Sequence, residues 1–147
     1  MKKRLTQEVI CLDLKGTTKE RVIAELVDLL ISVGKLQDRA AALDCVLARE
    51  RKMSTGMQHG IAIPHGKTDK VTDIVVALGL KKDGIEFGSL DGKPACIFVM
   101  VISPLGRTGP HIQFLAEISR VLSDRDVREG VLHAKSRREV LELLTSR

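Results

Sequence analysis

The chain has 147 residues, a formal net charge of +5 and a mean hydropathy of +0.03. This length suits a single domain spanning residues 1–147, which would bury about two thirds of its unfolded surface. The positive side chains are interspersed with negative ones, and the chain has three Phe but no Tyr or Trp. Nucleic-acid binding through a basic patch with stacking aromatic rings is therefore not expected.

The sequence also argues against a membrane or secreted class. It has no run of eighteen apolar residues, and its first residues, MKKRLTQEVICLDL, lack the apolar centre of a secretory signal. We expect a cytoplasmic protein without membrane insertion. Cys11, Cys45 and Cys96 are odd in number, widely spaced and without a CxxC pair, which favours buried free thiols over a disulfide framework or a zinc site.

The first half of the chain alternates between strand and helix patterns. Apolar runs predict short strands, and apolar residues at helical spacing behind Thr or Asp caps predict helices. The expected elements are a strand at 9–14, a helix from Thr17 or Thr18 to Gly34, a helix at 38–50, a loop at 54–60 and a strand at 61–63 that ends at Pro64.

The second half continues the alternation and contains the most apolar segment. ACIFVMVI, at 95–102, is nearly continuous in apolar character, so it predicts a strand buried on both faces. Around it we expect a strand at 74–80, a turn at 81–84, a loop at 103–110, and helices at 111–122, 126–133 and 136–144. The whole pattern predicts an α/β fold: a single domain with a mixed sheet of about four to five strands and helices on both faces.

The segment from Arg49 to Lys67, RERKMSTGMQHGIAIPHGK, places His65 in a distinctive backbone setting. Pro64 fixes its own φ and favours an extended residue before it, while Gly66 permits close backbone approach after it. We expect His65 to emerge at a strand terminus with its ring held by main chain. A neutral ring with one nitrogen fixed leaves the other as a nucleophile or acid/base group. The alternative is a histidine that ends a strand and only packs.

STG, three variable positions and then GIAIPHG resembles the phosphorylation-site signature of the fructose/mannitol-type enzyme IIA domains of the bacterial sugar phosphotransferase system. This type includes the nitrogen-regulatory IIA proteins. Arg49-Glu50 stands upstream as in that family, and a second histidine, His111, opens HIQFLAEISRVL. The resemblance covers nearly the whole chain. Two departures are His59, where a small or amide residue is expected, and Ile112, where Leu is usual.

The resemblance implies roles for particular residues. His65 would accept a phosphoryl group on Nε2 from the phosphohistidine of the carrier HPr and pass it to a cysteine or histidine of an enzyme IIB. His111 would donate a hydrogen bond to a phosphoryl oxygen beside an anion-favouring helix start. From the residues alone, His111 could instead simply cap its helix.

Arg49 could contact phosphate oxygens in a bidentate manner, or it could be a surface arginine paired with Glu50 or Asp44. Ser54, Thr55 and Gly56 could support the phosphate or the ring through hydroxyls and amides, with Thr55 the best single candidate. They could also form an ordinary polar turn.

Protein-to-protein phosphoryl transfer implies no cofactor and no metal, and the chain has no GxxxxGK[ST] motif for a nucleotide. His59 and His65 lack the spacing of a helical zinc motif. His133 is expected to be a partly exposed surface residue.

We keep two further hypotheses for the function. One is a nitrogen-regulatory IIA that controls target proteins through its phosphorylation state. The other is a metal-dependent or acid/base enzyme that acts on a small molecule through His65 and His111.

Overall fold

The computed structural model describes residues 4–146 and contains one mixed sheet flanked by helices. The strand order is β1-β4-β5-β2, and β3 also pairs with β5. The elements in chain order are η1 (Gln7–Val9), β1 (Ile10–Cys11), α1 (Lys19–Ser32), α2 (Arg39–Lys52), β2 (Ile61–Ala62), β3 (His65–Thr68), β4 (Val75–Ile85), β5 (Ala95–Pro104), α3 (Thr108–Leu122), α4 (Arg125–His133) and α5 (Arg137–Thr145).

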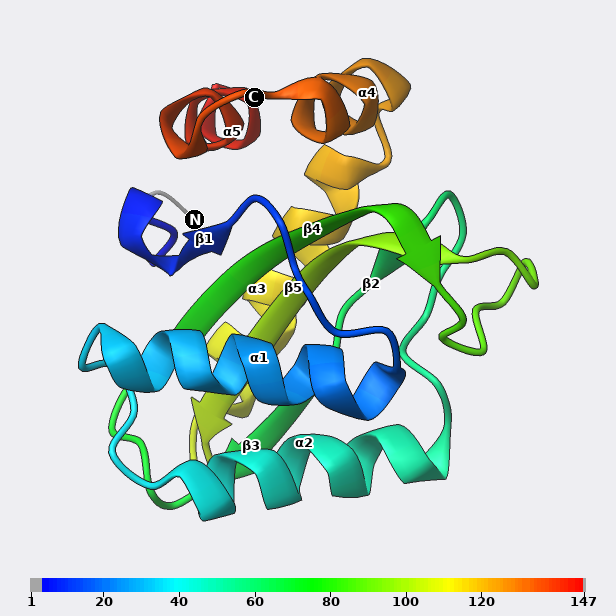
Figure 1. Ribbon diagram of the computed structural model, residues 1–147. Coiled ribbons are helices and arrows are strands. Elements are labelled where there is room, and N and C mark those ends of the chain that lie inside the picture. The colour runs from blue at the N-terminus through cyan, green and yellow to red at the C-terminus, as the bar shows by residue number, and fades with distance from the viewer. Residues whose placement is uncertain (1–3, 147) are drawn as a thin grey trace.

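Helices cover both faces of the sheet, as the sequence predicts. In Figure 1, α1 and α2 lie in front of the sheet and α3 lies behind it, while α5 packs against η1 and α4 packs against α3 and α5. This arrangement confirms the predicted α/β class with its five-stranded mixed sheet.

The core is centred on β5, as its apolar run predicts. Residues 97–102 of this strand are fully buried, because β5 is a central strand, paired with β4 on one edge and with β2 and β3 on the other, and helices cover both faces of the sheet. The pairing with β4 is antiparallel and the other two are parallel. Phe87 packs against Phe98 with ring centroids 5.5 Å apart, which joins the loop after β4 to this centre.

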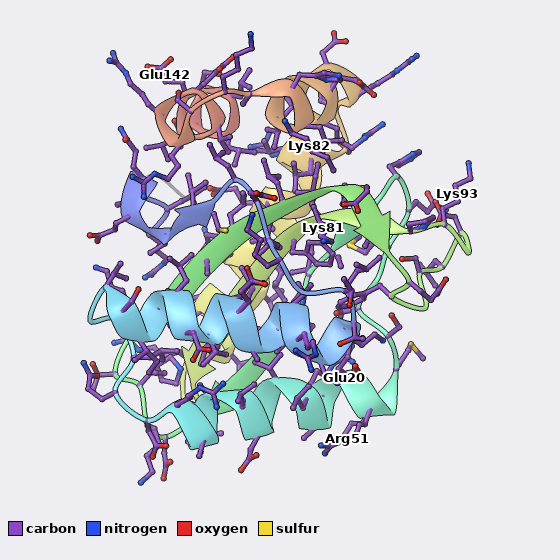
Figure 2. All side chains as sticks on the ribbon, viewed as in Figure 1. Glu20, Arg51, Lys81, Lys82, Lys93 and Glu142 are labelled. Carbon is purple, nitrogen blue, oxygen red and sulfur yellow. The ribbon has the colours of Figure 1, made fainter. Side chains whose placement is uncertain are left out.

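The charged side chains are spread over the surface rather than gathered by sign. Figure 2 shows Glu20, Arg51, Lys93 and Glu142 on separate elements, and all four are exposed.

The three cysteines are free thiols, as expected, but each is half-buried and not fully buried. Among the described residues, no helix combines the length and apolar character that crossing a membrane requires.

Several element boundaries differ from the predicted ones. β1 has only two residues instead of six, because its ladder with β4 joins Ile10 to Leu78 and Cys11 to Gly79 and goes no further. The predicted turn at 81–84 is wrong, since β4 continues to Ile85 with a register shift along β5.

The helix expected to open at residue 111 begins three residues earlier, at Thr108. Pro110 is the third residue of α3, where a backbone N–H would have no partner within the helix, so proline is tolerated there. The amide of His111 already donates to the carbonyl of Arg107. His111 therefore lies inside the first turn and is not the cap.

Candidate active site

His65 is the first residue of β3 and not the residue that follows a strand end. Pro64 separates β2 from β3 because it has no N–H to donate to a ladder. Both short strands pair with β5, and His65 stands opposite Val101. The ring is half-buried, and its Nδ1 lies 2.8 Å from the carbonyl oxygen of Ile63. A carbonyl only accepts hydrogen bonds, so Nδ1 carries the proton and Nε2 keeps its lone pair.

Ile63, whose carbonyl anchors the ring, is itself held through its amide by a chain of hydrogen bonds. The amide of Ile63 donates to the carbonyl of Thr55 at 3.1 Å. The amide of Thr55 donates to a carboxylate oxygen of Glu50 at 2.8 Å, and the Thr55 hydroxyl donates to the other oxygen. Through these bonds Glu50 of α2 holds the backbone of Ile63, the residue whose carbonyl anchors the His65 ring.

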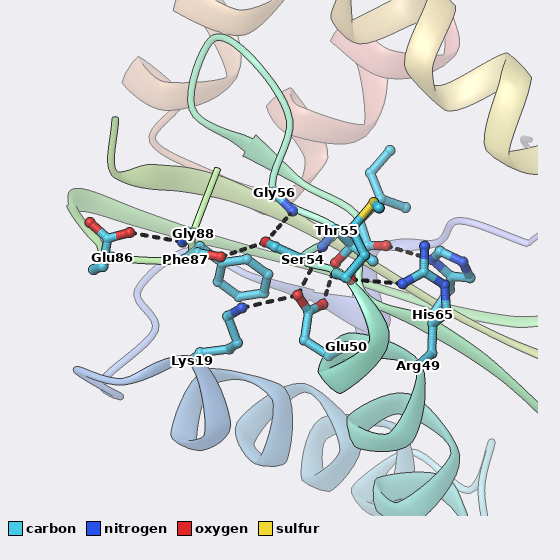
Figure 3. A network of polar contacts seen from close by, with 12 residues as sticks. Lys19, Arg49, Glu50, Ser54, Thr55, Gly56, His65, Glu86, Phe87 and Gly88 are labelled. Atoms are coloured by element: carbon cyan, nitrogen blue, oxygen red, sulfur yellow. Dashed lines mark hydrogen bonds and ion pairs between the residues drawn. The ribbon is translucent and has the colours of Figure 1, made fainter. Parts of the chain in front are cut away.

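Glu50 is only 6% exposed, so its charge needs partners inside the protein. Lys19 of α1 supplies a third contact, with Nζ 3.0 Å from Oε2 (Figure 3). The same ammonium lies 4.6 Å from the centroid of the Phe87 ring. The ion pair predicted as an alternative, Arg49 with Glu50, does not occur in the described structure, because Lys19 and Thr55 occupy the carboxylate.

Ser54, Thr55 and Gly56 line a cleft of about 270 Å³ together with His65. The Ser54 hydroxyl donates to the carbonyl of Phe87 at 2.6 Å and accepts from the amide of Gly56 at 3.0 Å. The donors of Thr55 are both directed to Glu50. In this structure the three residues shape the loop beside His65, and none of these side-chain bonds reaches the ring.

The predicted second histidine lies beside the first. The ring centroids of His65 and His111 are 5.4 Å apart, with the planes tilted by 55°. His111 is 4% exposed, and its Nδ1 contacts the hydroxyl of the fully buried Ser103 at the end of β5. The fold thus brings together two histidines that are 46 positions apart in sequence.

Burial keeps both rings neutral. It lowers the pKa of His65 below the ordinary value, an effect that the bond to Ile63 opposes and the charge of Arg49 strengthens. Burial also lowers the pKa of His111 to about 4, with His65 and Lys67 as further causes. Near neutral pH both rings are therefore neutral, and His65 keeps an unprotonated Nε2.

Two cations border the histidine pair. Arg49, in the last turn of α2, donates to the carbonyl of Met53 at 2.8 Å. Lys67, two residues beyond His65 on β3, donates to the Thr108 hydroxyl at 2.9 Å. Both line a second cleft, of about 530 Å³, together with His65 and His111. The positive charges and the amino-terminal end of α3 make this cleft favourable for an anion.

The other two histidines lie apart from this pair. His59 is exposed in a turn with φ 64°, and its amide donates to Asp91. It lines neither of the two clefts that contain His65. The side chain of His133 is 80% exposed on α4, as predicted. Within residues 4–146, no three His, Cys, Asp or Glu side chains are grouped so that they could hold a metal ion.

The site therefore has a histidine anchored by main chain, His65, beside a second histidine, His111, at a cleft that favours an anion. This arrangement is the one expected from the STG and GIAIPHG motif. A model of the phosphoenolpyruvate-dependent sugar phosphotransferase system EIIA 2 family matches residues 3–147. The chain belongs to this family. The resemblance drawn from STG and GIAIPHG is thereby confirmed.

Relatives of this EIIA chain include both transport and regulatory proteins. The fructose-specific EIIA component of the phosphotransferase system of Haloferax volcanii is 42% identical over 137 residues, which cover 93% of this chain and 89% of that protein. The crystal structure of nitrogen regulatory protein IIA-Ntr from Neisseria meningitidis matches with a TM-score of 0.91 and 30% identity, covering 98% of each chain.

A third similar structure is a complex of two proteins. It contains the mannitol enzyme IIA of Escherichia coli with phosphorylated enzyme IIB, and its match has a TM-score of 0.83 at 30% identity over 98% of this chain and 99% of that one. The fold of this EIIA chain is therefore shared by proteins named for sugar transport and for nitrogen regulation.

Three residues of the site were not identified from the sequence: Lys19, Lys67 and Ser103. Lys67 carried a usable signal, because residues i and i+2 of a strand point to the same face, and Lys67 therefore accompanies His65. Ser103 is the second-last residue of β5 and pairs with Lys67 of β3, and this register is not readable without the fold. Lys19 reaches Glu50 across 31 positions, and only the packing of α1 against α2 brings them together.

Proposed function

We propose that this EIIA chain is a phosphocarrier that accepts a phosphoryl group on Nε2 of His65 from phospho-HPr and passes it to an enzyme IIB for sugar uptake. The observation that carries the proposal is the bond from Nδ1–H of His65 to the carbonyl of Ile63. It leaves Nε2 unprotonated, and an unprotonated nitrogen is what an incoming phosphoryl group requires.

The transfer needs positioning and charge stabilisation more than covalent machinery. The N–P bond of the donor histidine breaks as the bond from Nε2 of His65 to phosphorus forms. His111 would donate a hydrogen bond to a phosphoryl oxygen, and Arg49 would turn from the carbonyl of Met53 toward the phosphate. Lys67, on the same strand face as His65, adds a second positive charge.

The onward step is the same exchange with a different acceptor. A thiolate sulfur, or a histidine nitrogen, of enzyme IIB attacks phosphorus, and the electron pair of the N–P bond returns to Nε2 of His65. Support comes from the Escherichia coli complex, which pairs a mannitol enzyme IIA with phosphorylated enzyme IIB on the same fold. Neither step consumes a metal or a nucleotide.

The surroundings of the cleft suit a protein partner. Met53 and Leu90 line the smaller cleft and Ile112 lines the larger one, and all three side chains are more than half exposed. Exposed large apolar side chains around a functional histidine favour contact with another protein surface. A macromolecular donor and acceptor would also exclude water from the N–P bond during transfer.

A nitrogen-regulatory role is the second candidate. The structural match to IIA-Ntr of Neisseria meningitidis, at a TM-score of 0.91, favours it. In that case the same phosphorylated His65 would change the affinity for target proteins. Phosphorylation adds about −1.5 to −2 charge beside Arg49 and Lys67, enough to alter partner choice by local electrostatics.

The proposal is tested by incubating the protein with phosphoenolpyruvate, enzyme I and HPr. We expect one acid-labile, base-stable phosphoryl group, mapped to His65 by mass spectrometry. His65→Ala should remove it, and the matched variant His59→Ala should retain it. A label that persists in His65→Ala would contradict the assignment.

Transport and regulation are then separated by the acceptor. Phosphorylated protein is mixed with enzyme IIB domains of the fructose and mannitol types, and loss of label from His65 is followed in time. Rapid transfer to one IIB supports sugar uptake. Retention of the label with every IIB, together with phosphorylation-dependent capture of a defined regulatory protein, would instead favour the nitrogen-type role.

A further inference from the structure

The contact between Ser103 and His111 is buried on both sides. Ser103 has no exposed surface, and it lies near the end of β5. His111 lies in the first turn of α3, and the intervening loop folds back so that the Ser103 hydroxyl meets Nδ1 of the ring. This is the only hydrogen bond that the Ser103 hydroxyl makes among residues 4–146.

The positions of the hydrogens follow from counting donors and acceptors. A hydroxyl has one hydrogen to donate, and a neutral imidazole has one N–H and one lone pair. If Nδ1–H donated to Ser103, the serine hydrogen would be buried without an acceptor, which is costly. If the hydroxyl donates to Nδ1, every hydrogen in the pair is satisfied, and the ring proton must sit on Nε2.

The charged ring, with protons on both nitrogens, would leave the same serine hydrogen unsatisfied. Burial disfavours it as well, since it lowers the pKa of His111 to about 4. The remaining arrangement is a neutral His111 with Nε2–H free for the cleft that it shares with His65. The two histidines then have opposite tautomers: Nδ1–H in His65, held by Ile63, and Nε2–H in His111, held by Ser103.

We propose that Ser103 is a positioning residue that fixes His111 as the Nε2–H tautomer, so that the ring presents a hydrogen-bond donor to the phosphoryl group on His65. The inference rests on the proposed phosphocarrier function. His111 keeps its proton throughout: the N–P bond of the donor breaks, the bond to Nε2 of His65 forms, and the Nε2–H of His111 only hydrogen-bonds a phosphoryl oxygen. In this role Ser103 acts only through its hydrogen bond to His111.

The unphosphorylated protein provides the first test. Ring nitrogens with and without a proton differ widely in ¹⁵N chemical shift, so two-dimensional NMR of the histidine side chains reads the tautomer directly. We expect a protonated Nε2 and an unprotonated Nδ1 in His111. A protonated Nδ1 in the wild-type protein would overturn the proposal without any variant.

Substitution provides the second test. Ser103→Ala removes the donor to Nδ1, and we expect Nδ1–H to become populated in His111 and phosphoryl transfer to slow by between about tenfold and a hundredfold. Ser103→Thr keeps a hydroxyl and should restore both the tautomer and the rate. Thr6→Val removes another buried hydroxyl, one with no partner in the described structure and lining a different cleft from that of the two histidines, and should change neither.

Failure of this inference and failure of the proposed function look different. If Ser103→Ala accepts and transfers phosphate at the wild-type rate with Nε2–H unchanged, Ser103 does not position His111. If the wild-type protein accepts no phosphate on His65 from phospho-HPr, the phosphocarrier function itself fails, while the tautomer of His111 can still be read.

Discussion

The buried neutral state of His111 makes stability depend on pH in a defined way. In the unfolded chain His111 titrates near its ordinary pKa of 6.5, whereas burial lowers the pKa in the folded protein to about 4. Between these values the unfolded chain binds a proton that the folded chain does not. Acid therefore favours unfolding. The contribution of neutral His111 to the free energy of unfolding is fully present above about pH 6.5 and is lost as the pH falls toward 4.

The magnitude follows from the two pKa values. A difference of 6.5 minus about 4 is about 2.5 pKa units, which corresponds to a limit of about 3 kcal/mol. Between about pH 7 and about pH 5, the linkage relation gives a loss of about 2 kcal/mol from His111 alone. This loss is a large share of the free energy of unfolding of a typical domain.

The assay is urea unfolding of the wild-type protein and of His111→Asn at several pH values between about 7 and about 4. Asn keeps an acceptor for Ser103 but does not titrate, so carboxylates and His65 contribute nearly equally to both proteins. We expect the wild-type free energy of unfolding to fall by about 2 kcal/mol more than that of the variant on going to about pH 5. Parallel pH profiles for the two proteins would refute the reasoning.

Three further substitutions test other contacts of the site. Arg49→Lys should leave the fold intact but slow phosphoryl acceptance about tenfold in a rapid-quench assay, because an ammonium lacks the planar fork. Glu50→Gln should lower the free energy of unfolding by about 3 kcal/mol in urea, since it leaves Lys19 without its anion. Gly66→Ala should cost about 1–3 kcal/mol, and Cys45→Ala should not restore it, because the added Cβ would also meet the Cys45 backbone at 2.8 Å. Wild-type behaviour in any of these variants would contradict the contact concerned.

The parts of the fold that the sequence predicts well depend on local signals. Thr18 caps α1 by accepting from the amide of Arg21, and Asp38 caps α2 by accepting from the amide of Ala41. Both caps follow from side-chain chemistry within four residues. The buried strand β5 follows from its uninterrupted apolar run, since a strand covered on both faces needs no polar alternation.

The parts that it does not predict depend on distant pairing. The apolar pattern at 74–80 gives no reason for β4 to run on through four polar or flexible positions, yet the ladder with β5 resumes at Ile85, opposite Ala95. Likewise, residues 9–14 have a strand-like pattern, but the partner strand offers only two paired positions. Strand length is set by the neighbour and not by the run itself.

The residues of the candidate site also fall into two groups: those that local sequence signals predict, and those that become apparent only in the folded structure. Pro64 and Gly66 mark His65 from their backbone preferences, and the family motif marks His111. The hydrogen bonds that fix the two rings come from Ile63 and Ser103, and the second of these cannot be read before the fold is known. The role of Glu50 is also hidden, because a glutamate beside Arg49 on a helix suggests a solvated pair, whereas the carboxylate points inward to Thr55 and Lys19.

The most direct test of the proposed phosphocarrier function is the identity of the phosphorylated nitrogen in His65. The protein would be labelled with ¹⁵N, phosphorylated through enzyme I and HPr, and its histidine side chains examined by NMR with ³¹P coupling. We expect phosphorus on Nε2 and a proton retained on Nδ1, where Ile63 holds it. Phosphorus on Nδ1 of His65, or on any other histidine, would contradict it.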